Sequence, residues 1–247
     1  MRRGLALVAA VLAAPATAHA GRTFYGWLYG TEVMPERGAE IQTFVQEENR
    51  QSAAANASET DWWFSPAIGI NDQLELLLPI EMDWTVADDQ GPRFTFVNFG
   101  GELRYRFVTA DPADKPALVP LIRVALKRQI TGTRDVWQPE ADLVTSYDFT
   151  DRVQALVDLG AVGHFNDNAQ NVELRPGAGV SVLSVGDVRF GAEVFAEIAL
   201  TNDGDGSWVA AGPNIAWSHG RSWLSAAYGI GILHIRDAPK INWGIAF

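Results

Sequence analysis

The chain contains no cysteine among its 247 residues. Without thiols it can form no disulfide framework, hold no metal through thiolates and use no cysteine nucleophile. A lipoprotein is excluded too, because its lipid would be attached to a cysteine. The fold must therefore be stabilised by non-covalent contacts.

Long apolar runs are also missing after residue 20, so the sequence predicts no transmembrane helix there. The N-terminus differs, because Arg2 and Arg3 precede the apolar run 4–14 and the small-x-small pattern Ala18-His19-Ala20. This order predicts a cleaved signal peptide over residues 1–20 rather than a membrane anchor, whose span would have to be longer. We expect the mature chain to begin at Gly21.

Basic residues are in short supply. The 19 lysines and arginines face 30 acidic residues, and loss of Arg2 and Arg3 leaves 17 basic side chains and a charge of −13. So acidic a chain offers no footprint for nucleic acid. No phosphate-binding glycine loop, nucleotide fingerprint or zinc spacing occurs, and 202–206 lacks the spacing of a calcium loop, so no cofactor or metal is expected.

The sequence is rich in aromatic residues, with nine tryptophans and twelve phenylalanines. Apolar and polar residues alternate in runs of about ten to fourteen, separated by turn residues. The longer runs match the nine to eleven residues that a tilted strand needs to cross a bilayer, whereas soluble strands average about five or six. About twelve strands are predicted, at 38–48, 60–70, 73–84, 94–107, 117–129, 135–148, 151–163, 171–183, 186–199, 207–218, 221–234 and 240–247.

The predicted connections alternate between tight turns and longer polar loops. Tight turns are expected at Asn71-Asp72, Thr150-Asp151, Val185-Gly186 and 218–220. Longer loops are expected at 49–59, 85–93, 130–134, 164–170, 200–206 and 235–239. Outer-membrane barrels place short turns in the periplasm and longer loops outside, so both termini would be periplasmic and the number of strands even.

The faces of these strands leave two folds open, a secreted β-sandwich and a membrane barrel. Val157 and Val194, for example, share an apolar face, while Asp158 and Glu193 point the other way. Aromatic residues favour the membrane barrel, because they flank the aliphatic middle of the strands. Aromatic side chains are enriched at the two lipid–water interfaces of such barrels. They are Trp62, Trp84, Trp137 and Trp208 at the loop ends, and Tyr105, Phe107, Tyr147, Phe149, Trp217 and Phe247 at the turn ends. The prediction is an all-β, closed antiparallel up-and-down transmembrane β-barrel over residues 37–247.

Both ends of the mature chain carry a resemblance. Residues 240–247 resemble the C-terminal assembly signal of bacterial outer-membrane proteins, with Trp243, Ile245 and the terminal Phe247 in place and Asn242 where glycine is usual. Residues 24–35 and 38–41 are similar to a loosely defined family of porin-like Gram-negative outer-membrane barrels, some described as transporters. The resemblance implies an outer-membrane location, with membrane lipid and the assembly machinery as partners. It implies no catalytic residues.

The polar face supplies the candidate functional residues. Acidic candidates outnumber basic ones, so the charges either line a water-filled pore that favours cations or pair across a narrow lumen and close it. The pore is slightly favoured, which predicts passive or gated passage of a small solute that the sequence does not specify. The expected pore-lining residues are Glu75, Glu81, Glu102, Arg104, Arg123, Lys127, Asp158, Arg175, Arg189, Glu193 and Glu197.

Residues 21–36 allow two interpretations, a periplasmic lead-in, which is favoured, or a small stopper in the lumen anchored by Trp27 and Tyr29. Two other functions compete with passage, a closed structural surface barrel and a lipid hydrolase. The hydrolase would use His234 and Ser207, oriented by a residue of 202–205, but these residues form no recognisable motif. The chain is therefore predicted not to be an enzyme.

Overall fold

The computed structural model describes residues 23–51, 56–87, 90–108, 117–131, 135–167, 170–201 and 206–247. The predicted signal peptide lies outside the described residues. Strands dominate the rest, and their bounds are β1 (Ala39–Gln51), β2 (Asn56–Asn71), β3 (Leu74–Leu77), β4 (Ile80–Ala87), β5 (Gln90–Arg106), β6 (Leu118–Gln129), β7 (Trp137–Asp148), β8 (Val153–Phe165), β9 (Gln170–Val185), β10 (Val188–Ala199), β11 (Trp208–His219), β12 (Ser222–Leu233) and β13 (Ile235–Ala246).

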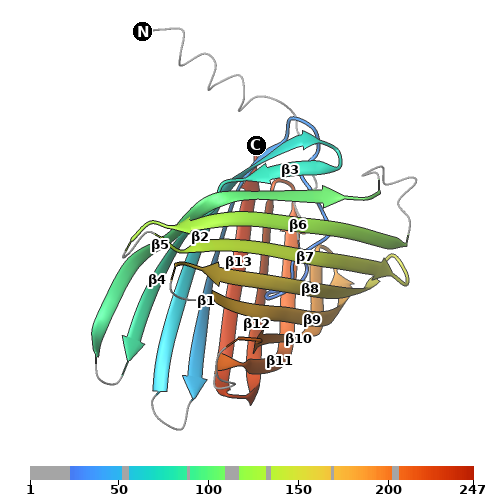
Figure 1. The fold of residues 1–247 in the computed structure, drawn as a ribbon. Coiled ribbons are helices and arrows are strands. Elements are labelled where there is room, and N and C mark those ends of the chain that lie inside the picture. The colour runs from blue at the N-terminus through green and yellow to red at the C-terminus, as the bar shows by residue number, and fades with distance from the viewer. Residues whose placement is uncertain are drawn as a thin grey trace, which may run out of the picture.

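All strands belong to one antiparallel sheet that closes on itself (Figure 1). Apart from β3 and β4, strands that follow each other in the chain are paired, and β1 pairs with both β2 and β13, which completes the ring. β3 and β4 lie between β2 and β5 and are two halves of one strand, interrupted at Leu78 and Pro79, where proline lacks the N–H for a ladder bond. The predicted closed barrel of about twelve strands is confirmed, and the β-sandwich is wrong.

The barrel has an apolar outside and a polar inside. Val157 is 46% exposed and Val194 is 40% exposed, while the intervening parity places Asp158 and Glu193 in the interior at 2% and 5%. A soluble barrel would bury the valines and expose the carboxylates, so this surface is typical of a barrel that faces lipid. Among the described residues, no helix has the length and apolar character needed to span a membrane.

The predicted tight turns are present, but the strands reach further into the predicted longer loops than expected. β1 and β2 remain paired out to Gln51 and Asn56, within the predicted loop 49–59. The predicted loop 235–239 is wrong, because these residues belong to β13 and the chain reverses at His234, which has a φ of 52°. Gly231 permits this close hairpin, since a Cβ there would lie 1.7 Å from the carbonyl oxygen of Ile235.

The expected aromatic residues are exposed at both ends of the strands, except for Trp208 and the half-buried Phe247. Trp62 and Trp84 are exposed near the loop ends, and Tyr147 and Phe149 near the turn ends. Trp208, predicted to face lipid, is only 1% exposed and lies inside the barrel. Its indole N–H donates to Glu197 there, 3.0 Å away, and its ring packs against residue Trp27.

The facing of the strands leads to a stability prediction. Val157→Arg and Val194→Arg should each destabilise the barrel by about 2–4 kcal/mol, because they place a charge in the middle of the lipid-facing band. The same change at Val185, the last residue of β9 at the turn end of the barrel, should cost only about 0–1 kcal/mol because it lies at the edge of that band. Urea unfolding of the refolded protein in lipid vesicles measures these differences. Equal losses at all three positions would contradict the facing assignment.

Candidate functional site

Residues 23–36 are called here the N-terminal segment, and its residues 23–34 lie inside the barrel (Figure 1). They form a loop, since the Thr23 hydroxyl donates to the carbonyl of Leu28 at 3.0 Å. Trp27 packs in the barrel, with its ring 5.2 Å from that of Phe195 and 5.4 Å from that of Trp208. Its indole N–H donates to the Ala238 carbonyl, 3.0 Å away. The segment therefore occupies the lumen, whereas the sequence favoured a lead-in outside the barrel.

Carboxylates of the barrel wall bind the backbone of the N-terminal segment. Glu193 accepts hydrogen bonds from the backbone N–H groups of Gly26 and Trp27, at 2.9 Å and 3.2 Å. Asp158 accepts one from Tyr29 at 3.0 Å. Glu75 accepts another, from the N–H of residue 34 at 2.8 Å. These three carboxylates satisfy backbone donors that would otherwise be buried without a partner.

Glycines on the inner face of β9 leave room for this segment. A Cβ at Gly177 would lie 2.2 Å from the Leu28 side chain, and one at Gly179 would lie 2.6 Å from the ring of Tyr25. Such close approach is a recurrent reason for glycine within a strand. These two inward glycines were the signal, missed in the sequence, that something packs against the wall.

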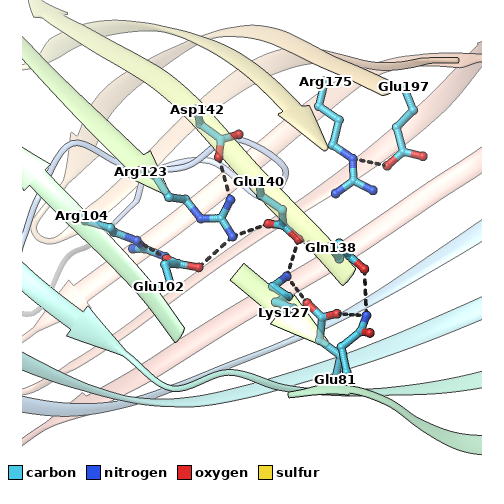
Figure 2. Close-up of polar contacts among 11 residues, drawn as sticks. Glu81, Glu102, Arg104, Arg123, Lys127, Gln138, Glu140, Asp142, Arg175 and Glu197 are labelled. Atoms are coloured by element: carbon cyan, nitrogen blue, oxygen red, sulfur yellow. Dashed lines mark hydrogen bonds and ion pairs between the residues drawn. The ribbon is translucent and has the colours of Figure 1, made fainter. Parts of the chain in front are cut away.

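On the part of the wall formed by β5, β6 and β7, charged side chains form a buried network (Figure 2). Arg123 is its centre, with contacts of 2.7 Å to Glu102, 2.6 Å to Glu140 and 2.6 Å to Asp142. Glu102 also binds Arg104 at 2.6 Å. The register explains the arrangement, because the basic residues of β6 have acidic residues of equal parity on both neighbouring strands.

The network continues toward the loop ends through Lys127. Its ammonium lies 2.6 Å from Glu140 and also contacts Glu81. Asn98 bridges Glu81 and Gln138, at 2.8 Å and 2.9 Å. Buried charges are tolerated only when they are paired and hydrogen-bonded in this way. Charge pairing, one of the two interpretations left open by the sequence, therefore holds for this wall.

All the predicted pore-lining side chains lie on the inner side of the wall, but they serve different contacts. Arg175 pairs with Glu197 at 3.2 Å, and the Arg189 guanidinium lies over the ring of Phe24, 4.1 Å from its centre. Glu75, Asp158 and Glu193 bind the N-terminal segment instead of facing open water. Whether any of the eleven residues lines a conducting path stays a prediction.

A cavity of about 540 Å³, called here the vestibule, lies between the N-terminal segment and the loop ends of the strands. Trp27 and Tyr29 contribute to its lining from below, together with Phe44 and Phe195 on the wall. Its charged lining consists of nine carboxylates, from Glu59, Asp61, Glu81, Asp83, Glu140, Asp142, Asp158, Glu173 and Glu197, and four basic side chains, from Arg123, Lys127, Arg175 and Lys240.

Sequence reasoning missed three of these residues as lumen candidates, Glu59, Asp61 and Lys240. Glu59 was assigned to a loop because β2 begins earlier than predicted, and Asp61 lay within the predicted strand 60–70 but was not assigned to the lumen. Lys240 was taken only as part of the C-terminal motif. Its ammonium lies over the rings of Phe44 and Trp27, 4.0 Å and 5.0 Å from their centres. It thus joins the wall to the N-terminal segment.

Two tyrosines of the N-terminal segment stay neutral in this setting. Burial raises the pKa of the Tyr25 hydroxyl above its usual range, and burial likewise raises the pKa of the Tyr29 hydroxyl. Arg123 and Arg104 lie over the Tyr29 ring, at 4.2 Å and 5.3 Å from its centre. The segment is therefore bound by cation–π contacts on its charged side and by aromatic packing on the other.

The arrangement around His234 does not form a nucleophile and base. His234 Nδ1 lies 3.1 Å from the backbone carbonyl oxygen of Ser207, and the Ser207 hydroxyl accepts a hydrogen bond from the N–H of Ala199 at 3.0 Å. No hydrogen bond joins that hydroxyl to the imidazole within the part of the chain that the structure describes. The proposed orienting residues at 202–205 lie outside the described residues.

The C-terminal strand β13 closes the ring against β1. Ile245 is 48% exposed on the outer face, and the backbone N–H of Phe247 donates to the carbonyl of Ala39 at 2.8 Å. Trp243 shares the parity of Ile245. A role of these three residues as an assembly signal stays a prediction.

No protein-family model matches the sequence, and no curated protein matches it. Among solved structures, the chain is similar to an outer membrane channel from Pseudomonas putida F1, with a TM-score of 0.63 and 10% identity over 88% of this chain and 98% of that one. It is also similar to the beta domain of the Bordetella autotransporter BrkA, with a TM-score of 0.56 and 14% identity over 86% of this chain and 100% of that one. For the KdgM porin the TM-score is 0.52, with 9% identity over 84% and 99% of the two chains.

These likenesses confirm the expected fold, that of porin-like outer-membrane β-barrels. One of the three similar structures belongs to an autotransporter and the other two to a channel and a porin. The same architecture therefore accompanies different functions, and the function of this chain has to be argued from its lumen.

The ion-pair network leads to a second stability prediction. Arg123→Met should destabilise the barrel by about 3–5 kcal/mol, because Glu102, Glu140 and Asp142 would be left buried without their shared partner. Arg93→Met, at an exposed position of β5, is the matched control and should change stability by about 0.5 kcal/mol or less. Urea unfolding monitored by tryptophan fluorescence compares the two. Equal losses would show that the network contributes little.

Proposed function

We propose that this protein is a channel in the outer membrane of a Gram-negative bacterium that admits small solutes passively and is gated by its N-terminal segment. The observation that carries the proposal is the vestibule of about 540 Å³ with the N-terminal segment as its floor. A closed barrel built only for structure has no need of a cavity of the size that small-molecule sites have.

The way the segment is bound supports a movable gate. Its contacts to the wall are side-chain hydrogen bonds, cation–π contacts, aromatic packing and an ion pair between Glu32 and Arg106 at 2.9 Å, all of them outside the strand ladder. Only at 35–38 does it join the sheet, where Arg37 donates to the carbonyl of Gly69 at 3.1 Å. The residues before that point can leave the lumen without breaking a strand pairing, and water can replace the carboxylate hydrogen bonds.

A closed structural barrel is the second candidate function, favoured by the paired charges on the β5–β7 wall. The two candidates differ in one respect. In the channel the N-terminal segment moves and current flows, whereas in the closed barrel the segment is a fixed part of the core.

An engineered crosslink tests the gate. The hydroxyl oxygens of Thr31 and Ser146 lie 2.7 Å apart, and the chain has no cysteine that could interfere. In the double variant Thr31→Cys/Ser146→Cys, a disulfide should tether the segment and suppress single-channel current in a planar bilayer. Reduction should restore the current. Deleting residues 21–34 should instead give larger and more stable steps, because the floor of the vestibule is gone.

Each single cysteine variant serves as the control and should conduct like the unmodified protein in both redox states. Current that is the same with the disulfide oxidised and reduced would show that the segment does not gate. Silence from both the unmodified protein and the deletion variant, with folding verified by circular dichroism, would favour the closed structural barrel.

A further inference from the structure

We infer that the vestibule binds a small organic cation of the quaternary ammonium or amine class. This inference deepens the proposed function and rests on it for its biological meaning, although binding itself requires no conduction. The argument begins with the charges of the vestibule lining, which do not balance.

Three of the four basic side chains in the lining are already neutralised by carboxylates. Arg123 binds Glu140 and Asp142, Lys127 binds Glu140 and Glu81, and the third, at position 175, binds Glu197. Four other carboxylates of the lining form no ion pair with a basic side chain of the described residues; they are those of Glu59, Asp61, Asp83 and Asp158. The vestibule therefore has a surplus of negative charge within low-dielectric walls, which concentrates cations.

Three of the surplus carboxylates form a cluster on adjacent strands of one wall. Glu59, Asp61 and Asp83 each offer an oxygen, and these oxygens lie within 4.8 Å of one another. Asp61 and Asp83 face each other directly across β2 and β4. Like charges in this position destabilise a sheet, so the cluster is a cost that a bound cation would remove. The hydrogen bond from Gln46 to Asp61, at 2.7 Å, brings no positive charge.

The fourth surplus carboxylate, Asp158, lies at the floor and is only 2% exposed. One of its oxygens binds the N–H of Tyr29, while the other, Oδ1, is buried with no hydrogen-bond partner in the described structure. A buried carboxylate oxygen without a partner costs free energy unless a donor or a cation reaches it. This second, independent feature of the cavity also calls for a positively charged occupant.

Aromatic rings make an organic cation a better occupant than a metal ion. Lys240 demonstrates the chemistry, because its ammonium rests on the rings of Phe44 and Trp27 and has no carboxylate partner among the described residues. Aromatic faces of this kind recognise quaternary ammonium groups. A calcium ion takes six to eight oxygen ligands, whereas the cluster brings together three carboxylate oxygens within 4.8 Å of one another. Because Lys240 covers the rings of Phe44 and Trp27, the solute's charge should lie toward Asp61 and Asp83, with the other rings of the lining, such as Trp63, left for its alkyl groups.

The test is isothermal titration calorimetry of the full refolded mature chain in detergent, with choline as the probe. The control ligand is 3,3-dimethylbutan-1-ol, which has the shape of choline without its charge. Choline should bind and the alcohol should not. Equal binding of both would show a merely apolar site and overturn the inference. No binding of choline, or displacement of choline by calcium at equal concentration, would overturn it as well.

Variants locate the site. Asp61→Asn/Asp83→Asn should weaken choline binding by about tenfold or more, and should fold well because it removes a like-charge contact. Asp151→Asn, an exposed change in a turn at the other end of the barrel, should leave affinity unchanged. An equal effect of both variants would overturn the assignment.

The two proposals can fail separately. Choline binding by a protein that never conducts would refute the channel and leave the binding site intact. Current without choline binding would refute the site and leave the channel intact.

Discussion

The closure of the sheet is the constraint on which the rest of this structure depends. Inside a bilayer no water satisfies backbone N–H and C=O groups, so a sheet must pair every edge, and β1 does this by bonding to both β2 and β13. Closure fixes the parity of every strand at once. One face then has to be apolar toward lipid, and the charged residues within the strands are directed largely into the lumen.

The lumen handles that charge in two ways. On the wall of β5, β6 and β7, acidic and basic residues meet across strands and neutralise each other around Arg123. On the wall of β8 and β10, basic partners are scarce, and carboxylates such as Glu193 bind the backbone N–H groups of the N-terminal segment. The segment thus acts as a hydrogen-bond donor that substitutes for missing arginines. This polar contact explains why an aromatic-rich peptide is held in a charged lumen.

The fold could be predicted from the sequence because its signals are periodic and local. The alternation that places Val194 outside and Glu193 inside repeats in almost every strand, and Val185-Gly186 marks a turn without reference to the rest of the chain. The site could be predicted only in part. Parity identified the inward carboxylates, but not which of them pair, since pairing depends on register between strands. Trp208 was placed wrongly for a different reason. Its outward placement assumed that aromatic residues at strand ends face lipid. Gly177 and Gly179 could have indicated a packed lumen segment, yet glycine within a strand equally marks a bulge or a tight bend.

The distribution of unbalanced charge links the two ends of the lumen. Glu193 and Asp158 accept hydrogen bonds from the N-terminal segment, whereas Asp61 and Asp83 lie in the vestibule, nearer the loop ends of the strands. Lys240 lies between them, over Trp27 of the segment and Phe44 of the wall. A cation entering from the loop end would repel the Lys240 ammonium, which helps to hold Trp27 in place. In the channel proposed above, Lys240 therefore opposes both the entry of a cation into the vestibule and the release of the N-terminal segment. Sequence reasoning had assigned this residue only to the C-terminal strand.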